Sequence, residues 1–178
     1  MADRSPTEEG TVTPARDAPM QVEDAGNNPV FRMFIDAIQS GSWASKPLAL
    51  QTLGIQPERW LKRVAPGRLV YEWPNDGAHD IQPGRVFGGW VGALSDHVVS
   101  MCMFSALEEG EDFTTQDLQI KLFRPVSGGV IRIEAEVVNR SRSTGYVEAR
   151  WLLENGKLAV KVLAWKAIRK PETLAPRA

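Results

Sequence analysis

The sequence predicts an α+β fold in which one long central helix is wrapped by a curved antiparallel sheet. Two observations predict it: an apolar stripe at helical spacing in residues 88–106, and period-two alternation of apolar and polar residues in the segments that follow. A single amphipathic helix must bury its stripe against other elements, and half-buried strands offer one apolar face for this purpose. The strands are therefore expected to curl round the helix.

The composition favours one domain in a reducing compartment. Of the 178 residues, 43% are hydrophobic, which is enough for one substantial core. Lysine and arginine number 21 against 22 acidic residues, a balance that argues against nucleic acid or an anionic membrane surface as partner. The single cysteine, Cys102, excludes an internal disulfide, and neither a secretory signal nor a membrane span is recognisable. We expect a cytoplasmic protein.

The N-terminal part divides into a tail and a helical extension. Residues 1–28 are rich in proline and acidic residues and poor in apolar ones, which is typical of a disordered tail. Residues 29–65 are expected to be a helical extension, because apolar residues recur at helical spacing from Pro29 until Gly41 ends the helix. The rest of the extension mixes tryptophan and leucine with proline and glycine, which predicts loop and short helix.

The segment 66–170 carries the strands and the long helix. Residues 68–73 have the β-branched and aromatic character of a strand, and the helix over 88–106 follows after a loop. Four further strands are expected as a meander, with Ser127-Gly128-Gly129 as a tight turn between the first two and Asn155-Gly156 as the last hairpin. Their alternating apolar positions are Leu118, Ile120 and Leu122; Ile131, Ile133, Ala135 and Val137; Val147, Ala149, Trp151 and Leu153; Leu158, Val160, Val162 and Ala164.

Gly88 and Gly89 stand at the predicted start of the long helix. The first N–H groups of a helix lack internal partners, and together with the helix dipole they can bind an anion or stabilise a developing oxyanion. Two glycines also let a substrate carbonyl approach this backbone closely. The alternative is that the pair simply forms a turn and allows tight packing against a strand.

Asp96 is a carboxylate in the middle of this helix, among apolar or small neighbours. It lies roughly 140° round the helix from Val91, off the apolar stripe, and is expected to point toward a cleft or a subunit interface. Aspartate is a poor helix former, and a partly buried carboxylate is costly unless it is paired or functional. Beside an oxyanion-binding helix end it could attack a thioester or activate a water. A solvated or salt-bridged aspartate is the alternative.

The run FGGWVGALSD, residues 87–96, resembles the motif His-Gly-Gly, six residues, Asp of the PaaI-like acyl-CoA thioesterases of the hotdog-fold superfamily. The likeness continues through DLQIKLFRP, residues 117–125, which matches the family's strand ending in an aromatic residue, a variable residue and proline. It covers about residues 66–168. The resemblance implies a hotdog fold and hydrolysis of acyl-CoA thioesters. Because the sheet's other face and the back of the helix still carry tryptophans and small residues, we expect a partner subunit to cover them, in a homodimer or a dimer of dimers.

The resemblance also implies roles for particular residues. Asp96 takes the position of nucleophile or general base, the Gly88 N–H that of an oxyanion donor supplied by the opposite subunit, and Thr115 that of a residue positioning the water or the thioester. Phe87 stands where the family has histidine, and because it cannot donate a hydrogen bond, the role of that histidine must be missing or supplied elsewhere. Gln82 is the nearest amide to an asparagine found upstream in many relatives.

Further contacts with the substrate are expected from polar strand ends and from the helix start. Forked arginine donors suit phosphate, and the family binds the phosphates of coenzyme A at strand ends, so Arg124, Arg142, Ser143 and Thr144 are candidates. Exposed arginines are, however, commonly just solvated. At the helix start Phe87, Gly89 and Trp90 are expected to contact the substrate, and Trp90 is the tryptophan favoured to face the acyl group, although tryptophans more often belong to a core.

No metal and no separate cofactor are expected, coenzyme A being part of the substrate. His79 and His97 show no ligand spacing, and His97 points away from Asp96 on the helix. Two other functions stay open. A hydratase or dehydratase of this fold generally uses a catalytic histidine, and Phe87 argues against it. A protein that binds acyl-CoA or a small ligand without turnover is favoured by Phe87, whereas Asp96 favours catalysis.

Overall fold

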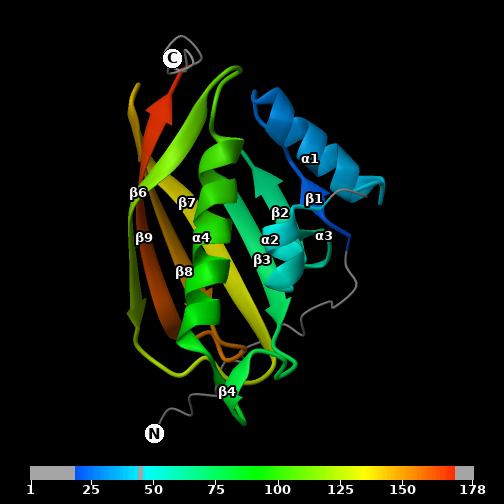
Figure 1. Cartoon of the computed structure of the whole chain (residues 1–178), viewed down its shortest axis with the longest axis vertical. Coiled ribbons are helices and arrows are strands. Elements are labelled where there is room, and N and C mark those ends of the chain that lie inside the picture. The colour runs from blue at the N-terminus through cyan, green and yellow to red at the C-terminus, as the bar shows by residue number, and fades with distance from the viewer. Residues whose placement is uncertain (1–18, 44–45, 171–178) are drawn as a thin grey trace, which may run out of the picture.

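The computed structural model describes residues 19–43 and 46–170, and in this part of the chain one helix lies across a seven-stranded sheet (Figure 1). The helix is α4 (Gly88–Ser105), and the predicted α+β architecture is confirmed. Neighbouring strands of the sheet are antiparallel except β1 and β2. In spatial order they are β1 (Gln21–Val22), β2 (Leu61–Ala65), β3 (Arg68–Pro74), β7 (Val130–Arg140), β8 (Thr144–Leu152), β9 (Leu158–Arg169) and β6 (Asp112–Leu122).

The strand order differs from the expected four-strand meander. β7, β8 and β9 pair in succession, but β6 pairs with β9 at the sheet edge and not with β7. The prediction of a tight turn between paired strands at Ser127-Gly128-Gly129 is therefore wrong. Residues 123–129 instead run from the edge strand β6 to β7, and Val126 accepts a hydrogen bond from the Val86 N–H on the way (3.2 Å). Alternation determines which face of a strand is buried, but it does not determine which strand lies beside it.

Four short strands form where none was expected, and two of them, β1 and β2, join the large sheet. β2 lies in the segment predicted as loop and short helix, where α2 (Leu48–Thr52) and α3 (Pro57–Trp60) also form. A register shift between Leu61 and Arg63 breaks the period-two pattern of β2, which hid it from the sequence. β1 lies within the expected tail, so the sheet begins before residue 66; residues 1–18 of that tail are outside the described residues.

The predicted N-terminal helix is α1 (Pro29–Gln39), and Asn28 fastens it to the domain. The Asn28 side-chain oxygen accepts hydrogen bonds from the N–H groups of Val30 and Phe31 and so caps the helix. Its amide nitrogen donates to the carbonyls of Glu108 and Glu111, just beyond α4. The extension is thereby tied to the far end of the central helix.

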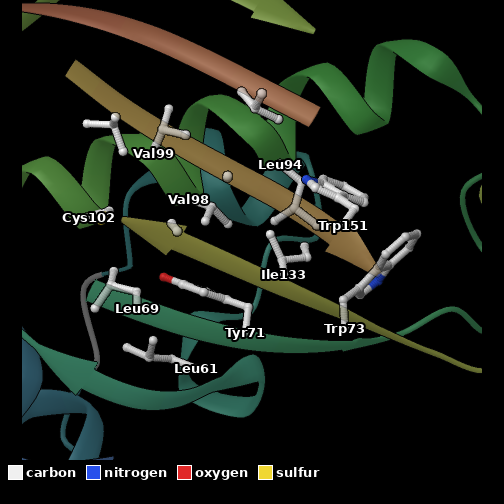
Figure 2. Packing of buried hydrophobic residues seen from close by; sticks show 14 of the residues in the cluster. Leu61, Leu69, Tyr71, Trp73, Leu94, Val98, Val99, Cys102, Ile133 and Trp151 are labelled. Atoms are coloured by element: carbon white, nitrogen blue, oxygen red, sulfur yellow. The ribbon is translucent and has the colours of Figure 1, made fainter. Parts of the chain in front are cut away.

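The core lies between α4 and the concave face of the sheet. Figure 2 shows Leu94 and Val98 of the helix facing Tyr71, Ile133 and Trp151 of the strands. The predicted stripe is buried at Val91, Leu94, Val98, Cys102 and Ser105, whereas Met101 is only partly buried. β4 (Asp80–Gln82) and β5 (Arg85–Val86) form a separate hairpin that leads into the start of α4.

Replacing Leu94 by alanine tests this packing. Leu94 is 0% exposed at the centre of the core, so Leu94→Ala should lower the free energy of unfolding by about 2–5 kcal/mol through lost burial and an unfilled cavity. Leu48→Ala is the matched control, because Leu48 is 75% exposed and should change stability by less than about 0.5 kcal/mol. Urea unfolding followed by tryptophan fluorescence measures both, and equal effects would contradict the described core.

Candidate active site

Asp96 lies halfway along α4, beside the strands β6 and β9. Its side chain is 50% exposed, so a substrate can reach the carboxylate. Thr115 of β6 donates a hydrogen bond from Oγ1 to Asp96 Oδ1 at 3.4 Å, and Lys166 Nζ of β9 lies 3.6 Å from the same oxygen. Asp96 and Thr115, which the sequence singled out separately, are thus brought together.

Lys166 was not among the candidates, although it is the most unusual group near Asp96. Its side chain is 0% exposed, and Nζ donates to Ser100 Oγ at 2.9 Å and to Thr115 Oγ1 at 2.7 Å. Burial lowers the pKa of Lys166 by disfavouring the ammonium, while the negative charge of Asp96 raises it in opposition. The alternation of β9 could have identified Lys166 as buried, because position 166 continues the buried positions 160, 162 and 164.

The polar turn between β7 and β8 lies close to this group. In the sheet, Gly145 of β8 is opposite Lys166, and Lys166 is opposite Thr115. The preceding residues 142–144 are exposed and therefore lie near the strand position that carries Lys166. The candidate phosphate ligands Arg142, Ser143 and Thr144 thus lie at this end of β8 and β9, where the Ser143 carbonyl accepts a hydrogen bond from the Ile168 N–H (2.8 Å).

The start of α4 forms a second group of candidate residues. The helix has no side-chain cap, and neither Gly88 nor Gly89 donates a backbone hydrogen bond to another described residue. A Cβ at Gly88 would meet nothing within 4 Å, so this N–H is approachable. At Gly89 the ring of Phe87 occupies the space that a side chain would need. The helix start therefore offers free N–H donors in front of an exposed aromatic ring.

A hollow of about 470 Å³ opens beside this helix start. Its lining is mainly apolar and includes Phe87, Gly88, Leu122 and Phe123. Arg124 also lines the hollow, and its Nη1 donates to the Leu158 carbonyl (2.6 Å). Gln82 lies on β4 outside this lining, where it accepts a hydrogen bond from Arg85 (3.4 Å). Arg124 is placed to meet a ligand in the hollow, whereas Gln82 is not.

Trp90 does not lie where we expected it. It is 5% exposed and packs edge-on against Trp60 and Trp73, and the ring of His79 stacks on it at 3.7 Å. Trp90 precedes Leu94 by one helical turn, so its side chain leaves the helix on the face that meets the sheet. The expectation that it faces the acyl group is therefore wrong, and it belongs to the core.

The two groups of candidate residues are well separated within one chain. Gly88 and Asp96 are eight residues apart on one straight helix, which corresponds to about 12 Å along its axis. A carbonyl that accepts a hydrogen bond from the Gly88 N–H cannot also be within reach of Asp96 of the same chain. Any reaction that uses both groups at one carbonyl needs a second copy of the chain.

The histidines show no metal-binding arrangement. The residues that the structure describes contain no group of three or more histidine, cysteine or acidic side chains that could hold an ion. His97 packs inside the domain with Nε2 3.3 Å from the Tyr71 hydroxyl. Burial lowers the pKa of His97 to about 4, helped by the positive charge of Lys46, so its imidazole is neutral at pH 7.

Comparison with known proteins agrees with this architecture. Residues 83–160 match the family model described as the thioesterase superfamily. A thioesterase from Haemophilus influenzae is similar in structure, with TM-score 0.63 and 22% identity over 79% of this chain and 93% of that one. A phenylacetic acid degradation-related protein from Ralstonia eutropha has TM-score 0.61 and 27% identity over 75% of this chain and 98% of that one.

A third similar structure is a hypothetical thioesterase from Streptococcus pneumoniae with coenzyme A, with TM-score 0.57 and 16% identity over 68% of this chain and 97% of that one. Among curated proteins none matches this chain. The domain has the hotdog fold, as the resemblance implied, and its residues 83–160 are similar to the thioesterase superfamily. No helix in the described residues combines the length and apolar character needed to cross a membrane.

The neutral, buried state of His97 predicts a loss of stability in acid. As the pH falls from 6.5 toward 4, the unfolded chain binds a proton at His97 that the folded chain does not, so the free energy of unfolding should fall by roughly 3 kcal/mol. His97→Gln should remove this part of the pH dependence in urea unfolding between pH 7 and pH 4. His79→Gln is the control for the other histidine, and an unchanged slope in His97→Gln would contradict the assignment.

Proposed function

We propose that the protein is an acyl-CoA thioesterase that uses Asp96 as nucleophile or general base and the Gly88 N–H of the opposite subunit as oxyanion donor. The observation that carries the proposal is the half-exposed Asp96 carboxylate, hydrogen-bonded to Thr115, on the same helix as an uncapped and open N-terminus. The match of residues 83–160 to the thioesterase superfamily model supports the reaction class.

The residues suit the charge changes of thioester hydrolysis. When a water activated by Asp96, or Asp96 itself, adds to the thioester carbon, negative charge moves to the carbonyl oxygen. A backbone N–H at the positive end of a helix stabilises this charge without reorganisation. Collapse of the adduct then expels the coenzyme A thiolate. In the water route this leaves the acid, and the proton that Asp96 took from the water can pass to the thiolate; in the other route it leaves an acyl-aspartyl anhydride, which one water hydrolyses. Thr115 can orient either Asp96 or the water.

A homodimer is part of the proposal, because it would bring the Gly88 of one chain to the Asp96 of the other. β6 pairs with β9 on one side, and its other side has no strand partner in the described part of the chain. The exposed apolar side chains of Leu122, Phe123 and Phe87 lie together at the end of β6, where all three line the hollow. The convex face of the sheet carries ion pairs instead, including Arg68 with Glu136 and Lys161 with Glu148. We therefore expect dimerisation at the β6 edge.

The substrate is proposed to span both groups of residues. The apolar hollow at Phe87 and Leu122 suits the acyl group or the pantetheine arm, and Arg124 or Arg142 with Ser143 and Thr144 suits the phosphates. The coenzyme A named with the Streptococcus pneumoniae relative supports this ligand class. A cytoplasmic location goes with the proposal, in keeping with the free thiol of Cys102.

Thiol release from a panel of short, long and aromatic acyl-CoAs tests the function. Asp96→Asn should lower kcat/KM by about 100-fold or more, because the amide can neither attack nor accept the proton of the water. Asp36→Asn is the matched control, since Asp36 is an exposed aspartate on α1, outside the β6 edge and the candidate site, and should leave the rate unchanged. If the wild type releases no thiol but binds an acyl-CoA tightly, the protein is a binding module and the enzyme proposal fails.

Gly88→Pro tests the oxyanion donor with little change in shape. Proline is favoured in the first turn of a helix, the space around Gly88 is open, and Phe87 already has the extended conformation that a following proline requires. The substitution removes only the N–H, so kcat should fall about 100-fold to 1000-fold while the melting temperature stays near that of the wild type.

Mixing inactive Gly88→Pro with inactive Asp96→Asn then tests whether the site is shared. If each site combines Asp96 of one chain with Gly88 of the other, a mixed dimer has one site with both residues intact. Random exchange of subunits should therefore restore about a quarter of the wild-type activity. Failure to regain activity, with mixed dimers demonstrated by mass spectrometry, would rule out the shared site.

A further inference from the structure

We propose that Lys166 is a positioning residue of the active site, which holds the Thr115 hydroxyl in one orientation and supplies the counter-charge of Asp96. The inference rests on the proposed function, because it assigns Lys166 a part in how Asp96 works. Lys166 lies on β9, beyond the segment 83–160 that matches the superfamily model.

The direction of the hydrogen bonds follows from the chemistry of the ammonium group. A protonated lysine has three donors and no acceptor, so the oxygens of Ser100 (2.9 Å) and Thr115 (2.7 Å) must accept from Nζ. The hydroxyl hydrogen of Thr115 must then point elsewhere, and Asp96 Oδ1 is the acceptor at 3.4 Å. Lys166 thus turns Thr115 into a dedicated donor to the carboxylate.

The charges around Lys166 make Asp96 its ionic partner. From α4 it meets Asp96 and the buried thiol of Cys102, whose pKa is raised by burial so that the thiol is neutral. From β6 it meets Thr115 and the ring of Phe113, 5.3 Å from Nζ to the ring centroid. Gly145 is opposite it on β8. Lys166 is fully buried while Asp96 is half exposed, so the ammonium lies behind the carboxylate, away from solvent.

A buried ammonium group does not by itself favour the stability of the folded domain. Removing a charge from water is unfavourable, and apolar replacements of buried ion pairs are often neutral or stabilising. The lowered pKa of Lys166 agrees, since the folded domain holds the charged form less readily than water does. A lysine required only for folding should lower stability when it is replaced by an apolar residue of similar length, whereas a positioning lysine should lower turnover instead.

The test compares Lys166→Met, Lys166→Arg and the control Lys161→Met in the acyl-CoA assay across pH. Lys161 is on the same strand but is paired with Glu148 (3.1 Å) on the convex face. Lys166→Met should lower kcat at least tenfold with little change in KM, and its melting temperature at pH 7 should not fall. Lys166→Arg should recover part of kcat. Wild-type kcat in Lys166→Met would overturn the proposal.

The pH profile gives a readout that a merely structural role would not move. In the wild type, kcat should decline on the alkaline side with a midpoint below 10.5, the ordinary pKa of lysine, because deprotonated Lys166 loses its charge and can accept a hydrogen bond. This limb should be absent from Lys166→Met and displaced to higher pH in Lys166→Arg, since guanidinium does not titrate there. An unchanged limb in both variants would contradict the role.

A measurement without substrate separates this proposal from the thioesterase assignment. In protein labelled with ¹³C-lysine, the Cε resonance missing from Lys166→Met reports the titration of Lys166. The negative charge of Asp96 raises the pKa of Lys166, so the midpoint should be lower in Asp96→Asn than in the wild type. Equal midpoints would overturn the ion pair, whether or not the wild type hydrolyses acyl-CoA.

Discussion

The burial of α4 in the concave face of the sheet is the constraint on which the rest of the structure depends. The helix is too apolar on one side to face water, so strands must lie along it, with β3 and β7 toward one flank and β9 and β6 toward the other. Asp96 sits just off the buried stripe and therefore emerges between the helix and β6. The same straight helix holds Gly88 about 12 Å away, which separates the two halves of the candidate site.

The sequence predicted where the helices and strands lie along the chain better than which strands lie side by side. Helical spacing and period-two alternation located α1, α4 and the strands after α4, because burial on one face leaves a mark on the residues themselves. The pairing of β6 with β9 could not be predicted in this way, since all half-buried strands show the same alternation of apolar and polar residues. β2 escaped notice for a related reason, because its bulge at Leu61 disturbs the alternation.

Residues of the candidate site were predicted where the residue itself is unusual in its place in the sequence. They were missed where their role depends on side chains that only the fold brings close. Asp96 is conspicuous because a carboxylate interrupts an apolar helix, and Thr115 followed from the family resemblance. Lysine by itself indicates a surface residue, although position 166 continues the inward register of β9. Its polar partners Ser100, Thr115 and Asp96 come from elsewhere in the fold and could not be read from the sequence. Trp90 was expected at the substrate because it follows Gly89 in the sequence. Its spacing of four residues from the buried Leu94 is the better guide and assigns it to the core.

Phe87 in place of histidine removes one hydrogen-bond donor from the start of the helix. At the helix start the chain offers no side-chain donor at position 87, only backbone N–H groups and an apolar ring. In the proposed shared site, orientation of the thioester carbonyl would therefore depend on how rigidly the two helices of the dimer are held. Around Asp96 the hydrogen-bond directions are fixed, because the buried ammonium behind the carboxylate leaves Thr115 a single direction in which to donate. A site that lacks a hydrogen-bond donor on the substrate side can still hold its reacting groups in a fixed geometry, because the carboxylate and its hydroxyl partner are oriented by a charge in the core.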